Sequence, residues 1–116
     1  MLAYVDTRTL DGHVLQFHAT GPGAFAARVR DLVAGSISLR LYPHGDRWCW
    51  SLTGPFLPPA LQPAAGEADT LAKAQAECRA KFEAWLSWAQ GAPVMWNAGA
   101  GERPQRPPLS PRAAQR

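Results

Sequence analysis

The chain has 116 residues, and 47% of them are apolar, which is enough for one hydrophobic core and argues against two domains. The formal net charge is +3, yet residues 1–97 hold eight basic and eight acidic side chains, so the excess lies entirely in residues 98–116. A neutral body argues against a dedicated nucleic-acid-binding face, because such faces neutralise phosphates. The sequence has no long uncharged apolar run and no basic, apolar leader, so we expect no membrane span, no signal peptide and a cytoplasmic location.

Residues 3–20 are predicted to form two strands joined at the turn-forming sequence Asp11-Gly12-His13. This register gathers one set of apolar side chains on a single side of the pair, namely Val5, Leu15, Phe17 and Ala19.

A Gly-Pro-Gly break at residues 21–23 then precedes a predicted short helix over residues 24–34. Gly35 is a suitable C-terminal stop. The apolar residues that recur there at helical spacing are Phe25, Val29, Leu32 and Val33.

The clearest pattern in the chain predicts a β-hairpin from Ile37 to Thr53. If residues 43–46 form a four-residue turn, Tyr42 pairs with Arg47, and Arg40 pairs with Cys49. One face of the hairpin then carries Ile37, Leu39, Leu41, Trp48, Trp50 and Leu52. The other face carries Ser38, Arg40, Tyr42, Arg47, Cys49 and Ser51.

Four prolines in residues 54–66 predict an extended connection, because proline interrupts both helices and strands. Asp69 or Thr70 then caps a long helix predicted over residues 71–90. Glu77 and Lys81 have the four-residue spacing of a helix-stabilising ion pair. The stripe expected to face the sheet is Leu71, Ala74, Cys78, Phe82, Trp85, Leu86 and Ala89.

The C-terminal part contains two further predicted segments. Residues 94–96 follow the Gly-Ala-Pro sequence that ends the helix and are expected to fold back as a short apolar latch. Residues 98–116 are rich in proline and arginine and have little to bury, so we predict a disordered tail. Its candidate phosphate contacts are Arg103, Arg106 and Arg112.

Catalytic and metal-binding patterns are missing from the sequence. No pair among the three histidines has the spacing of a metal site or an acid–base couple, so we expect no metal and no cofactor. Cys49 is predicted to be exposed and Cys78 buried, which makes them two free thiols. Arg40 would lower the pKa of Cys49, but a nucleophile also needs a base and an oxyanion pocket. We therefore expect a protein that is not an enzyme.

Two groups of side chains are candidate contacts for a partner. Arg40, Tyr42 and Arg47 form a polar, partly aromatic patch on the outer hairpin face, although a solvated sheet face has the same composition. Trp88 lies off the centre of the helix stripe and Trp96 follows the helix, so one or both are expected to be exposed, as binding hot spots often are. Alternatively, these two rings pack on each other.

One stretch carries three features in order, namely Trp48-Cys-Trp50-Ser-Leu52-Thr-Gly54, then Gly66-Glu-Ala68-Asp-Thr70, then Ala74 inside the predicted helix. Over about residues 37–90 this pattern resembles small, mostly uncharacterised proteins of bacterial prophages, plasmids and other mobile elements. Anti-CRISPR inhibitors are prominent among such proteins and act by stoichiometric binding. The resemblance therefore implies a non-enzymatic inhibitor of a host protein or ribonucleoprotein complex. Many such inhibitors are acidic mimics of nucleic acid, and this neutral body departs from that pattern.

Together these patterns predict one α+β domain over residues 1–97 and a disordered tail over residues 98–116. Its small antiparallel sheet is expected in β-β-α-β-β-α order, covered by one short and one long helix. We expect a protein-interaction module that is a monomer or a homodimer. Two alternatives stay open: a nucleic-acid-binding accessory protein that uses the basic tail, and a small enzyme without a recognisable motif.

Overall fold

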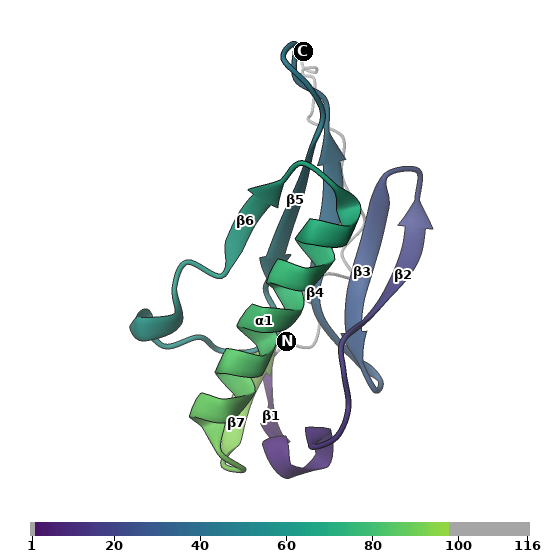
Figure 1. Ribbon diagram of the computed structural model, residues 1–116. Coiled ribbons are helices and arrows are strands. Elements are labelled where there is room, and N and C mark those ends of the chain that lie inside the picture. The colour runs from purple at the N-terminus through teal and green to yellow at the C-terminus, as the bar shows by residue number, and fades with distance from the viewer. Residues whose placement is uncertain (1, 98–116) are drawn as a thin grey trace, which may run out of the picture.

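Two antiparallel sheets and one long helix make up the computed structural model, which describes residues 2–97 (Figure 1). The strands are β1 (Leu2–Asp6), β2 (Gln16–Gly21), β3 (Ala24–Val29), β4 (Leu32–Arg40), β5 (Arg47–Leu52), β6 (Ala65–Ala68) and β7 (Pro93–Asn97). The helix α1 spans Leu71–Ala89, and two short 3-10 helices, η1 and η2, span Thr7–Leu10 and Pro59–Leu61. Five strands form a sheet in the order β2-β3-β4-β5-β6, and β1 pairs with β7 in a separate sheet.

The predicted β-β-α-β-β-α order with two helices is wrong, because residues 24–34 form strands. β3 and the start of β4 occupy this stretch and are joined by a two-residue turn, in which Arg30 has a positive φ of 54°. A short apolar run satisfies both the helical and the strand period, so spacing alone does not separate them. Two β-branched residues, Val29 and Val33, are buried here and favour the strand.

The predicted hairpin over residues 3–20 is also wrong. β1 pairs with β7 from the other end of the described chain, and Tyr4 lies opposite Met95. After β1 the chain turns into η1, where the Asp6 carboxylate accepts a hydrogen bond from the Arg8 amide at 3.0 Å. This cap directs the chain away from β1 before β2 begins.

The tryptophan-bearing hairpin is present as β4 and β5, but its register differs by two residues from the predicted one. Arg40 lies opposite Arg47, because the loop covers residues 41–46 rather than 43–46. A shift of two residues preserves the alternation of faces, so both tryptophans keep their predicted side. Leu41, which was expected to face inward, lies in the loop and is 74% exposed.

β6 is an additional strand that follows the predicted extended connection. It lies opposite β5, with Gly66 across from Trp50. A Cβ atom on Gly66 would lie 2.9 Å from Trp50 Nε1, so glycine lets the indole lie close to the β6 backbone. Gly66 was expected to end the extended connection and instead lies in β6. The predicted helix cap is confirmed at Thr70, whose hydroxyl accepts from the Lys73 amide at 3.1 Å.

α1 confirms the predicted long helix to within one residue and lies against β5 and β6 (Figure 1). Trp85 of α1 is fully buried, and its Nε1 donates to the Phe56 carbonyl at 2.9 Å. The helix thereby joins the extended connection to the core. No helix within residues 2–97 is both long and apolar enough to cross a membrane. Two members of the predicted stripe, Leu71 and Leu86, are only partly buried. The other predicted members are buried: Ala74, Cys78, Phe82, Trp85 and Ala89.

Candidate partner-binding site

Three neighbouring strands bring the predicted polar patch together around Glu67. Arg40 ends β4, Arg47 begins β5, and Tyr42 lies in the loop between them. Glu67 lies in β6, opposite Cys49 of β5. Strand alternation points the strand residues Arg40, Arg47 and Glu67 away from α1, because Trp50, which follows Cys49 in β5 and faces the opposite side, is bonded to that helix. We call Arg40, Tyr42, Arg47 and Glu67 the outer cluster.

Glu67 is the shared acceptor of the outer cluster. Tyr42 Oη donates to Glu67 Oε2 at 3.1 Å, and Cys49 Sγ donates to the same oxygen at 3.6 Å. Arg47 Nε lies 3.7 Å from Glu67 Oε1, and both side chains are partly exposed. The Tyr42 ring stacks on His44, with ring centroids 5.2 Å apart. These contacts hold Tyr42 and Arg47 in defined positions on an accessible surface.

Arg40 and Arg47 lie directly opposite each other in the ladder between β4 and β5. Like charges at such positions destabilise a sheet. Glu67 supplies one negative charge against two positive ones, so the outer cluster has a net charge of 2 − 1, or +1. A hydrogen bond to Tyr42 raises the pKa of Arg40. The cluster therefore presents surplus positive charge at every physiological pH.

Cys49 is not an activated nucleophile. Burial raises the pKa of its thiol, and the hydrogen bond to Glu67 raises it further, against the lowering effect of Arg40 and Arg47. The neighbouring arginines therefore do not generate a thiolate at neutral pH. Cys78 lies on the buried side of α1, and burial raises its pKa to about 12. Both cysteines are free thiols.

The two tryptophans predicted as partner contacts lie in different environments. Trp88 is 45% exposed near the C-terminal end of α1, which Figure 1 shows at the opposite end of the molecule from the loop between β4 and β5. Trp96 is 1% exposed and donates from Nε1 to the Val33 carbonyl at 3.1 Å. Its ring meets Trp85 edge to face, rather than Trp88, with centroids 5.7 Å apart. Trp96 is therefore a core residue and is withdrawn from the predicted partner surface.

The predicted nucleic-acid contacts Arg103, Arg106 and Arg112 lie outside the described residues, as does the predicted disordered tail. Residues 1–97 have balanced charges, with eight basic and eight acidic side chains. The excess positive charge at the outer cluster therefore comes from where these residues lie, and not from an overall excess of basic residues.

The three histidines and the metal-ligating side chains do not gather within residues 2–97 into a group that could hold a metal ion. No three histidine, cysteine, aspartate or glutamate side chains lie close enough there to hold a metal ion. His13 and His18 are exposed on a loop and on β2, and His44 stacks on Tyr42.

A polar cleft lies far from the outer cluster, where η1 meets the end of α1. It has a volume of about 690 Å³. The residues that line it include Arg8, Asp11, Glu83, Leu86, Ser87, Gln90 and Gly91.

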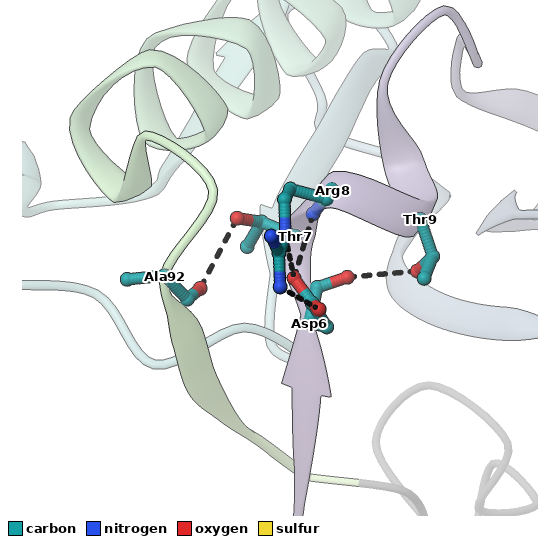
Figure 2. A network of polar contacts seen from close by, with 5 residues as sticks. All are labelled: Asp6, Thr7, Arg8, Thr9 and Ala92. Carbon is teal, nitrogen blue, oxygen red and sulfur yellow. Dashed lines mark hydrogen bonds and ion pairs between the residues drawn. The ribbon is translucent and has the colours of Figure 1, made fainter.

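The polar contacts beside this cleft connect η1 to the chain that follows α1 (Figure 2). Arg8 donates to Asp6 Oδ2 at 3.0 Å, and the Thr9 hydroxyl donates to the Asp6 carbonyl at 2.8 Å. The Arg8 guanidinium lowers the pKa of Asp6, so the carboxylate is ionised at neutral pH. Thr7 is fully buried and donates to the Ala92 carbonyl at 3.1 Å. Because these groups satisfy one another, the network is structural.

Comparison of the chain with protein-family models, with curated proteins and with solved structures finds no significant match. The resemblance to mobile-element proteins is thus a prediction from the sequence motifs alone.

Glu67 is the member of the outer cluster that sequence reasoning missed. Its strand has four residues and follows a proline-rich connection, which is too short a stretch for alternation to distinguish a strand from a helix start. The signal in the sequence that could have indicated a strand is the alternation of an acidic residue with an apolar one. In the structure Glu67 is exposed and Ala68 is buried. The acidic residue in that alternation is the one that pairs with Arg47.

Proposed function

We propose that this protein is a non-enzymatic protein-binding module whose outer cluster binds an acidic group on a partner protein. The direct opposition of Arg40 and Arg47 across the strands carries this proposal. Opposed arginines disfavour the sheet, and a carboxylate between them would relieve the repulsion. Local conflicts with stability of this kind are typical of functional sites.

The chemistry of the side chains supports an acidic partner group. A guanidinium is planar and can donate two parallel hydrogen bonds to one carboxylate. The stacked rings of Tyr42 and His44 add flat contact area beside the two arginines. Tyrosine and arginine are enriched in protein interfaces and in their hot spots. Glu67 orders Tyr42 and Arg47 before any partner arrives, which lowers the entropy lost on binding.

The class of partner follows from the sequence resemblance. A protein of the mobile-element type would bind a host protein or a ribonucleoprotein complex of a defence system in the cytoplasm, and would inhibit it stoichiometrically. Trp88 could widen such a contact only for a partner that reaches both ends of the molecule, because it lies far from the outer cluster (Figure 1).

The test is affinity capture from the native host with the full chain, followed by binding measurements on the purified partner. The double variant Arg40→Glu/Arg47→Glu should lose the partner. Lys81→Glu makes the same kind of charge reversal on α1, about two turns beyond Lys73, and should bind as the unmodified chain does. Equal capture by both variants would contradict the proposal.

A mobility-shift measurement across a range of salt concentrations separates the main alternative. Tight, steeply salt-dependent binding to nucleic acid that disappears on deleting residues 98–116 would favour the nucleic-acid-binding protein instead. If the Arg40→Glu/Arg47→Glu variant bound nucleic acid as tightly as the unmodified chain, the tail alone would account for that binding.

A further inference from the structure

The sheet of β1 and β7 has one open backbone edge among the described residues. The outer side of β7 is covered by the chain at residues 54–56, since the Asn97 amide donates to the Gly54 carbonyl at 2.7 Å and the Phe56 amide donates to the Met95 carbonyl at 3.0 Å. No strand within residues 2–97 pairs with the other side of β1. An open strand edge is a template for pairing with another chain.

The contacts of β7 determine which groups of β1 point outward. The Met95 carbonyl and the Asn97 amide point toward residues 54–56. Because successive residues of a strand direct their N–H and C=O groups to opposite sides, those of Val94 and Trp96 point toward β1. Their register partners on β1, Val5 and Ala3, therefore bond to β7. The N–H and C=O groups of the alternate residues then point to the open edge. These residues are Leu2, Tyr4 and Asp6.

Large apolar side chains gather next to this edge. Leu2 and Tyr4 are 62% and 74% exposed. Met95, across the register from Tyr4, and Phe56 are 37% and 58% exposed. Leu2, Phe56 and Met95 also line a cleft of about 450 Å³ whose walls are mainly apolar. A contiguous exposed apolar patch is characteristic of an interaction surface.

We propose that this edge is a homodimer interface, in which β1 of one copy pairs antiparallel with β1 of a second copy about a two-fold axis at Tyr4. The central residue of the five-residue strand, Tyr4, points its N–H and C=O outward, so the symmetric register pairs both groups with those of the second copy. The Asp6 carbonyl already accepts from the Thr9 hydroxyl at 2.8 Å, so the Tyr4 pair is the centre of the proposed contact. Tyr4 pairs with Tyr4 of the second copy, and Leu2 pairs with Asp6 in both directions.

The side chains are compatible with this register. A two-fold axis perpendicular to the sheet keeps Leu2 and Tyr4 of both copies on the same face, so the two apolar patches become continuous. Asp6 lies opposite an apolar Leu2, and its carboxylate is already paired with Arg8 at 3.0 Å, so no like charges face each other. The new sheet has four strands, with β7 of each copy on the outside. This interface does not involve the outer cluster and leaves it accessible.

The first experiment measures the mass of the full chain by sedimentation or light scattering across a wide concentration range. The unmodified chain should show a reversible monomer–dimer equilibrium, and a small interface implies weak association. Tyr4→Lys puts like charges opposite each other on the axis and should weaken dimerisation about tenfold. Leu41→Lys is the matched control, because Leu41 is also 74% exposed and lies in a distant loop. A chain that stays monomeric, or equal weakening by both variants, overturns the proposal.

The second experiment tests the register by cross-linking. Hydrogen-bonded antiparallel partners have Cα atoms about 5.5 Å apart, which a disulfide can span. Tyr4→Cys should therefore give a disulfide-linked dimer under mild oxidation, and peptide mapping should place the bond between the two introduced cysteines. Leu41→Cys should not. Equal cross-linking of the two variants, or a bond through Cys49, would contradict the proposed pairing.

Discussion

The indole nitrogen of Trp50 donates to Glu77 Oε1 at 2.9 Å, and this hydrogen bond joins β5 to α1 across the core. Glu77 had the spacing of a helix-stabilising pair with Lys81. The structure instead uses its carboxylate to satisfy a buried donor, since Trp50 is only 6% exposed. A tryptophan N–H buried without an acceptor would destabilise the fold.

Replacing Glu77 should therefore destabilise the protein according to what it leaves for Trp50 Nε1. We expect Glu77→Ala to lower the free energy of unfolding by about 1–3 kcal/mol, because the indole N–H loses its partner. Glu77→Gln should cost less, because an amide oxygen still accepts. Urea unfolding followed by circular dichroism measures both. Glu83→Ala, an exposed position on the same helix, is the control, and an equal loss in that variant would refute the argument.

Gly35 should tolerate no side chain. A Cβ atom there would lie 2.0 Å from the Ser51 carbonyl oxygen of the neighbouring strand, and a backbone atom in a sheet cannot move aside cheaply. We expect Gly35→Ala to lower the free energy of unfolding by about 3 kcal/mol or more. Gly21→Ala is the control, because open space surrounds its Cβ position. Similar melting temperatures for the two variants would contradict this expectation.

The charged residues of the outer cluster should control how fast the Cys49 thiol reacts. Glu67 raises the pKa of this thiol through a hydrogen bond and its charge, whereas Arg40 and Arg47 lower it. Glu67→Gln removes the charge and leaves both arginines, so the pKa should fall and the thiol should react faster with a disulfide reagent at neutral pH. Glu83→Gln should leave the rate unchanged. A slower reaction in Glu67→Gln would show that the contacts of Cys49 are not those described.

The burial of Cys78 should make the folded protein less stable at alkaline pH. Its pKa is raised to about 12 by burial, so the unfolded chain releases this proton at lower pH than the folded chain does. Stability is therefore complete below the unfolded pKa of about 8.5 and decreases as the pH rises toward the folded value. Between pH 8.5 and 10 the unmodified protein should lose about 1–2 kcal/mol more than Cys78→Ala. Parallel stability curves for the two proteins would exclude this linkage.

The sequence was sufficient for α1 and for the faces of β4 and β5 because local pattern determines them. Nineteen residues of α1 carry a sustained apolar stripe, and Trp48, Trp50 and Leu52 alternate without conflict. The hairpin register was off by two residues, since the loop length depends on where pairing ends and not on the strand pattern.

The remaining differences come from long-range pairing. β1 pairs with β7, and β3 is a strand because β2 and β4 lie on either side of it. Local spacing is ambiguous for such short runs, and the neighbours that decide between helix and strand are distant in sequence. The same limit applies to the site. Arg40, Tyr42 and Arg47 come from one hairpin and could be grouped from the sequence, whereas Glu67 comes from a separate strand.

The pairing of β1 with β7 also has a consequence for synthesis of the chain. Leu2 lies opposite Asn97, so β1 has no partner in this sheet until β7 has been synthesised. Trp96 arrives with that strand and completes the edge-to-face contact with Trp85. A nascent chain that ends before residue 93 would leave β1 unpaired and one side of Trp85 uncovered. Closure of this part of the core therefore requires both ends of the described chain.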